Sequence, residues 1–145
     1  MRIGDLYDRD FLEWTVRNAE LLRAGRFQEA DIEHIAEEIE DMGKSQRRAL
    51  ESRLEVLLAH LLKWQFQPEG RGSSWRATIL LQRAKISKLL REMPSLRATV
   101  SDELPDAYKN AILAAVGETN LPDETFPATC PFSAEQILAD GFFPE

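Results

Sequence analysis

The chain has 145 residues, a length that predicts one domain covering residues 1–145. It contains 43% hydrophobic and 30% charged residues and carries a formal net charge of −7, which is ordinary for a soluble globular protein. Its apolar runs are too short for a membrane span, and its N-terminus lacks the pattern of a signal peptide. Cys130 is the only cysteine, so we expect no internal disulfide and a cytoplasmic protein.

Helical signals begin close to the N-terminus. Asp8 or Asp10 is suited to cap a first helix, and Gly25 is suited to end it in the left-handed conformation that glycine adopts most easily. Asp31 is suited to cap the next helix. The first quarter of the chain therefore predicts one helix, a short link and the start of a second helix.

The second helix should be long. Its apolar residues share one stripe at the helical spacing, and the stripe keeps its phase on both sides of Gly43. A hairpin broken at Gly43 would have no reason to keep this phase, so we predict one continuous helix over about residues 32–66. The stripe consists of Ile32, Ile35, Ala36, Ile39, Met42, Leu50, Leu54, Leu57 and Leu61.

A corner rich in Pro, Gly and Ser follows, and then a third helix. Ser73 or Ser74 is suited to cap this helix, which should stop before Pro94. A weaker helical piece is expected over residues 95–103, and Pro105 is suited to the first turn of another helix.

The C-terminal part contains a tether and a short helix. Residues 119–132 include three prolines and should be extended, whereas the segment from Ser133 to Gln136 matches a capping box and predicts a helix reaching Asp140. No alternating apolar and polar run is long enough to predict a strand. We therefore predict an all-α fold, a helical bundle built on one long central helix, with a Pro-rich C-terminal tether and a short terminal helix.

The corner at residues 60–83 concentrates aromatic and polar side chains and is the first candidate site. Gln82 falls between Ile79 and Ile86 on the apolar stripe of the third helix, so we expect it to be largely buried and hydrogen-bonded to the segment at residues 60–71. The cluster can be a fixed polar network or the lining of a small pocket. Its members are His60, Lys63, Trp64, Arg71, Trp75, Gln82 and Arg83.

A metal site is a second candidate. The acidic run contains Asp31-x-x-His34 and His34-x-x-x-Glu38, spacings that place ligand side chains on one helix face. The only other histidine is His60, about 33 Å from Glu38 along a continuous helix at 1.5 Å per residue. We therefore expect no metal and no cofactor, and we expect Glu38 to pair with a cation from a neighbouring helix.

The distribution of charge raises the question of nucleic acid. Residues 1–43 carry a net charge of −7, residues 44–97 carry +8 and residues 98–145 carry −8. The basic middle segment can bind nucleic acid, and the spacing of Arg53 and His60 falls within the loose pattern of helical RNases of the HEPN type. The other reading is a basic helix pair flanked by acidic neighbours in the same domain, and we favour it because it requires no partner.

A series of motifs resembles a known bacterial family along nearly the whole chain. Among them are Tyr7-Asp8-x-Asp10-Phe11-x-x-Trp14, Glu37-Glu38-Ile39-Glu40-x-Met42-Gly43, His60-Leu-Leu-Lys-Trp64, Ser74-Trp75-x-x-Thr78-Ile79, Phe126-Pro127-x-x-Cys130-Pro131 and Phe142-x-Pro144. In these segments the chain resembles family 29 of the bacterial domains of unknown function. The resemblance implies a small, mostly α-helical bacterial protein and assigns no catalytic residue.

Three hypotheses about function remain open at this point. The favoured one is a non-catalytic bacterial interaction or accessory domain that acts with an unknown protein partner or with a second copy of itself. The alternatives are a helical bundle that acts on RNA or binds nucleic acid through the basic middle segment, and a metal-dependent enzyme. Nothing in the sequence predicts contact with a membrane.

Overall fold

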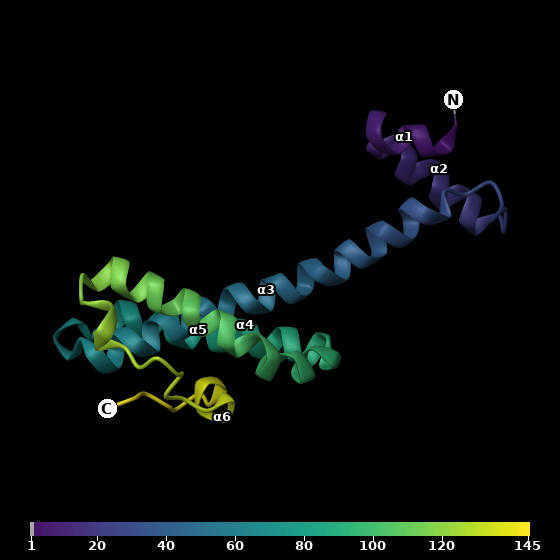
Figure 1. Ribbon diagram of the computed structural model, residues 1–145. Coiled ribbons are helices and arrows are strands. Elements are labelled where there is room, and N and C mark those ends of the chain that lie inside the picture. Colours follow the sequence, from purple (N-terminus) through teal and green to yellow (C-terminus); the bar gives the residue numbers. More distant parts are fainter. Residues whose placement is uncertain (1) are drawn as a thin grey trace. The chain divides into compact units, whose positions relative to one another are not determined.

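The computed structural model describes residues 2–145 and shows an all-α fold. Six α-helices and three short 3₁₀ turns follow one another, without a strand in the described part of the chain (Figure 1). This confirms the predicted fold class. The chain divides into two compact units, Met1–Gln46 and Arg47–Glu145, which are called the N-terminal and C-terminal units below.

The N-terminal unit contains α1 (Ile3–Arg9), α2 (Phe11–Arg23) and the beginning of α3. Asp10 caps α2 as predicted, since its Oδ1 accepts a hydrogen bond from the amide of Glu13 at 3.1 Å. Gly25 follows the end of α2 with a φ of +74°, the left-handed conformation that was predicted. Helix α1 was not predicted, because its seven residues bury only Leu6 and so give no periodic signal.

Helix α3 (Ile32–Phe66) is continuous over 35 residues and confirms the prediction made from the phase of its apolar stripe. Gly43 lies inside it, and apart from its own helical turn no atom lies within 4 Å of the place where a Cβ would sit. Glycine is therefore not required there by any close approach. The helix persists because its other residues outweigh the roughly 1 kcal/mol that one interior glycine costs.

In the C-terminal unit a 3₁₀ turn at Pro68–Gly70 leads into α4 (Ser73–Glu92). The predicted serine cap is wrong: Gly72 occupies the capping position and Ser73 already lies in the helix, so no side chain caps it. Gly70 is required sterically, because a Cβ there would lie 2.4 Å from the indole ring of Trp75.

Helix α5 (Arg97–Thr119) is also continuous, which corrects the prediction of a new helix beginning at Pro105. Proline inside a helix removes one hydrogen bond and costs about 3 kcal/mol or more. The helix tolerates it because one buried stripe keeps its phase across the proline and holds both halves in the core. That stripe consists of Val100, Ala107, Tyr108, Ala111 and Ala115.

The predicted tether returns along the bundle and ends in α6 (Ala134–Leu138), which the capping box of Ser133 and Gln136 begins as predicted. The helix stops at Leu138, before the predicted Asp140. Figure 1 shows the tail, in yellow, beside α4 and α5. Buried residues of α3, α4, α5 and the tail form one core, with Phe126, Phe132 and Ile137 as the contribution of the tail.

None of the helices described over residues 2–145 combines the length and the apolar character needed to cross a membrane.

Candidate functional site

The polar side chains predicted to share one network at the corner are held by separate partners. Lys63 is the most unusual of them, with only 5% of its surface exposed. Its Nζ lies 2.5 Å from Oε2 of Glu118 on α5 and 4.8 Å from the ring centre of Trp75. A buried ammonium needs such a carboxylate to offset its lost hydration, so this ion pair fastens α3 to α5.

Arg71 and Trp64 form a second, local contact. Arg71 Nε donates a hydrogen bond of 2.6 Å to the backbone oxygen of Trp64, and its guanidinium lies 5.5 Å from the indole centre. The carbonyl of Trp64 belongs to the last turn of α3, where carbonyls have no partner within the helix. Arg71 therefore caps the C-terminal end of α3.

Arg83 is the deepest polar residue of the corner, with 1% of its surface exposed. Its Nε donates to the backbone oxygen of Ile137 at 2.8 Å, and its terminal nitrogens donate to the backbone oxygens of Gln136 and Asp140 at 3.4 Å. Burial lowers the pKa of the guanidinium from its ordinary value, but not enough to remove its charge near neutral pH. The cation thus satisfies the free carbonyls at the end of α6 and fixes the tail to α4.

The prediction for Gln82 is wrong about its hydrogen-bond partner. The residue is half-buried, and its Oε1 accepts a hydrogen bond of 3.4 Å from Arg53 rather than from residues 60–71. The buried stripe of α4 contains Ile79, Arg83 and Ile86, so the polar residue that faces the core is Arg83. Both positions fit the spacing between the two isoleucines, and the packing of the tail decides between them.

His60 and Arg53, the pair that fits the RNase spacing, have separate partners. His60 Nδ1 lies 2.9 Å from the backbone oxygen of Val56. Burial lowers the pKa of His60 below its ordinary value, so the ring is neutral at pH 7. Arg53 is engaged with Gln82. These contacts are those of a structural histidine and a structural arginine.

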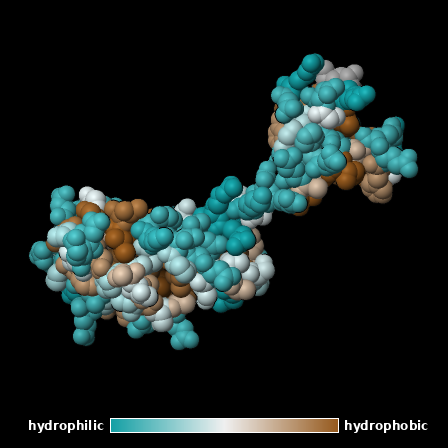
Figure 2. Space-filling view, viewed as in Figure 1, coloured by the Kyte–Doolittle hydropathy of each residue, from teal (hydrophilic) through white to brown (hydrophobic). Residues whose placement is uncertain are grey.

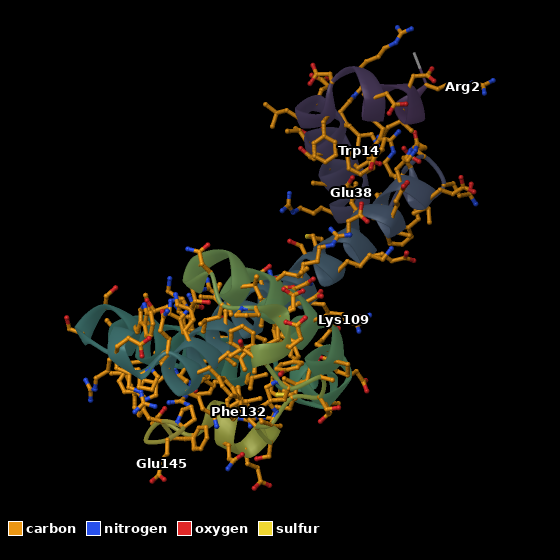
Figure 3. All side chains as sticks on the ribbon, turned by 60° about the vertical axis from the view of Figure 1, so that its left-hand side comes forward. Arg2, Trp14, Glu38, Lys109, Phe132 and Glu145 are labelled. Atoms are coloured by element: carbon orange, nitrogen blue, oxygen red, sulfur yellow. The ribbon has the colours of Figure 1, made fainter. Side chains whose placement is uncertain are left out.

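A cluster in the N-terminal unit was largely missed by the sequence reasoning. Trp14 Nε1 donates to Asp31 Oδ2 at 2.9 Å, and His34 Nδ1 lies 2.6 Å from the same oxygen. Tyr7 stacks on His34 with ring centres 4.0 Å apart and donates its hydroxyl hydrogen bond to Glu38. Figure 3 labels two of its residues, Trp14 and Glu38. The prediction that Glu38 pairs with a cation is therefore wrong, because its carboxylate accepts a hydrogen bond from Tyr7 of α1.

The electrostatics of this cluster follow from its hydrogen bonds. The bond to Glu38 raises the pKa of Tyr7 to about 12, and the contact with Asp31 raises the pKa of His34. Burial would raise the pKa of Asp31, but the hydrogen bonds from Trp14 and His34 together lower it. Over residues 2–145 no three His, Cys, Asp or Glu side chains come together as a metal site. The cluster clamps α1 and α2 to the beginning of α3.

The N-terminal unit also exposes several large apolar side chains, and Figure 2 shows separate brown areas on its otherwise largely hydrophilic surface. The first part of the α3 stripe is open to solvent, with 52% of Ile32, 58% of Ile39 and 61% of Met42 exposed. Single exposed apolar residues are normal, but these three share one face of α3 by their spacing, and an apolar stripe left open on a helix is a candidate interaction site. Five further large apolar side chains of this unit are exposed: Phe11, Leu12, Val16, Leu22 and Phe27.

The C-terminal unit has a groove between α3 and α4. It is lined by Ala49, Ser52, Arg53, Val56 and Gln82, and its volume is about 260 Å³. Pockets for drug-sized ligands are typically about 300–1,000 Å³, so this groove is suited to one or two side chains rather than to a cofactor.

The chain matches the model of a protein family over most of its length. The family described as "Domain of unknown function DUF29" matches residues 6–143. The chain belongs to this family. No curated protein and no solved structure matches the chain. The family description assigns no activity.

Proposed function

We propose that this protein is a non-catalytic helical interaction protein whose N-terminal unit carries the binding surface. The observation that carries the proposal is the excess of exposed over buried large apolar side chains in that unit. Among its described residues it buries two apolar side chains, Leu6 and Trp14, and exposes eight large ones. A small helical unit with more large apolar groups outside than inside is stabilised when a partner covers them.

The corner supports a non-catalytic role. A nucleophile or general base needs a free reactive atom within reach of a substrate. The ammonium of Lys63 and the guanidinium groups of Arg71 and Arg83 are instead engaged with a carboxylate or with backbone carbonyls of their own chain. Each of these contacts joins one element of the bundle to another, which is a structural task.

The proposed setting is the cytoplasm of a bacterium. Cys130, the only cysteine, is half-buried, and burial raises the pKa of its thiol. A thiol of this kind is unreactive and suits a reducing compartment.

A photoreactive amino acid at Ile39 tests the proposal in cells that produce the full chain. Irradiation should give one discrete adduct, because a bound partner lies within reach of this position. The matched control is the same amino acid at Leu113 on α5, which is 68% exposed but belongs to the C-terminal unit. Equal labelling at both positions, or no adduct at Ile39, would contradict the proposal.

A further inference from the structure

The exposed part of α3 in the N-terminal unit is both apolar and acidic. Ile32, Ile35, Ile39 and Met42 follow one another at spacings of three, four and three residues, the pattern of a helix seam that packs on another helix. The chain contains no Lys or Arg between Arg26 and Lys44. The seam is accompanied by the exposed carboxylates of Glu33, Glu37, Glu40 and Asp41.

The groove of the C-terminal unit is also partly apolar, but the charged side chains in and around it are basic. Its lining includes the apolar side chain of Val56, which is 38% exposed. Arg53 lines the groove itself. Arg48 and Lys85 are exposed and lie one helical turn from the lining residues Ser52 and Gln82.

We propose that two copies of this chain associate, with the acidic apolar seam of α3 in one copy lying in the basic-rimmed groove between α3 and α4 of the other. An amphipathic helix laid in an apolar groove is a common mode of recognition. Complementary charge selects the partner and increases the rate of encounter. A closed two-fold pair uses the contact twice, once from each copy. The inference rests on the proposed function and names the partner as a second copy.

The size of the groove agrees with this occupant. At about 260 Å³ it has room for one or two branched side chains, such as successive isoleucines of the seam. A second copy also supplies both halves of the charge pairing from one sequence, since residues 1–43 carry −7 and residues 44–97 carry +8.

Sedimentation of the purified full chain tests the proposal directly. The mass should rise with concentration to twice 16.6 kDa and stop there. The variant Ile39→Lys should weaken association at least tenfold, while Leu113→Lys, the matched exposed control, should leave it unchanged. Circular dichroism should show the same helical content in both, because neither side chain is buried.

A charge exchange makes the test specific. One variant carries Glu33→Lys and Glu40→Lys, and the other carries Arg48→Glu and Lys85→Glu. Each alone should associate at least tenfold more weakly than the natural chain, because like charges then face each other. An equal mixture should restore association, because each seam again meets a groove of opposite charge. Lys109→Glu, an exposed reversal on α5, serves as the control.

The outcomes separate this inference from the proposed function. If the chain stays monomeric up to about 100 μM, the proposal that its partner is a second copy is overturned. The proposed function then still stands if the photoreactive group at Ile39 gives a discrete adduct with a different protein. Association that is insensitive to both charge exchanges, or that grows beyond a pair, also overturns the inference.

Discussion

The two units use the same helix in opposite ways. In the C-terminal unit the α3 stripe is completely buried, and nineteen apolar residues form one core with three large apolar side chains exposed. In the N-terminal unit the same stripe is open, and among residues 2–46 two buried apolar residues accompany eight large apolar ones that are exposed. An apolar stripe on a helix therefore predicts burial only where other elements of the chain cover it. Where none does, it becomes a candidate binding surface.

The strongest test of this contrast compares two positions of the stripe. Leu57 is fully buried and Ile39 is 58% exposed. Leu57→Ala should lower the free energy of unfolding by about 3–5 kcal/mol, through lost burial and the cavity left behind. Ile39→Ala should change it by less than about 0.5 kcal/mol in the monomer. Urea denaturation at low protein concentration measures both, and equal effects would show that the stripe is covered throughout.

Two arginines that face the same ring of Phe143 provide the next comparison. The guanidinium carbons of Arg83 and Arg76 lie 5.6 and 5.9 Å from its centre, but Arg76 is exposed and Arg83 is buried. Arg83→Met should cost about 1.5–3 kcal/mol, because the carbonyls at the end of α6 lose a charged donor. Arg76→Met should cost well under 1 kcal/mol. Hydrogen exchange over residues 126–143 should rise only for Arg83→Met; similar values would place the anchor of the tail elsewhere.

Two glycines should respond with opposite signs. Gly43→Ala should stabilise the chain by up to about 1 kcal/mol, since a Cβ there meets no atom within 4 Å. Gly70→Ala should destabilise it by about 1–3 kcal/mol, because the Cβ would lie 2.4 Å from Trp75. Both are measured by thermal unfolding in the Ile39→Lys background, so that association does not contribute. A loss of stability at Gly43 would indicate a hidden contact on that face of α3.

The pKa values of the two histidines should be displaced in opposite directions from the ordinary value of 6.5. NMR should place His34 above that value because of Asp31, and His60 below it because of burial. The N-terminal unit is then fully stabilised by the His34 contact below about pH 6.5 and loses that contribution as the pH rises through the folded pKa. His60 has the opposite sign, since its protonation below about pH 6.5 works against the fold. Asp31→Asn should move only His34, and a shift of both would show that the two sites are coupled.

Candidate functional residues were harder to predict than helices, because their neighbours come from distant parts of the chain. Residues 60–83 were recognised as unusual, yet Lys63 finds Glu118 and Arg83 finds the carbonyls of the tail, more than fifty residues away. In the N-terminal cluster, Asp31, His34 and Glu38 were noticed in the sequence as a possible metal set, whereas Tyr7 and Trp14 appeared only as part of family motifs. Helical spacing alone does not define whether Gln82 or Arg83 faces the core, because this depends on the side from which the tail packs on α4.

The sequence by itself determined the features that depend on neighbouring residues along the chain. The all-α class, the cap at Asp10, the left-handed Gly25, the continuous α3 and the capping box at Ser133 follow from hydrogen bonding and periodicity within a few turns. Only the tertiary structure decided which part of the α3 stripe is buried, that α5 continues through Pro105, and which cation enters the core. These outcomes depend on free energies of burial, which exist only when distant elements meet and which exceed the local cost of a proline or a buried charge.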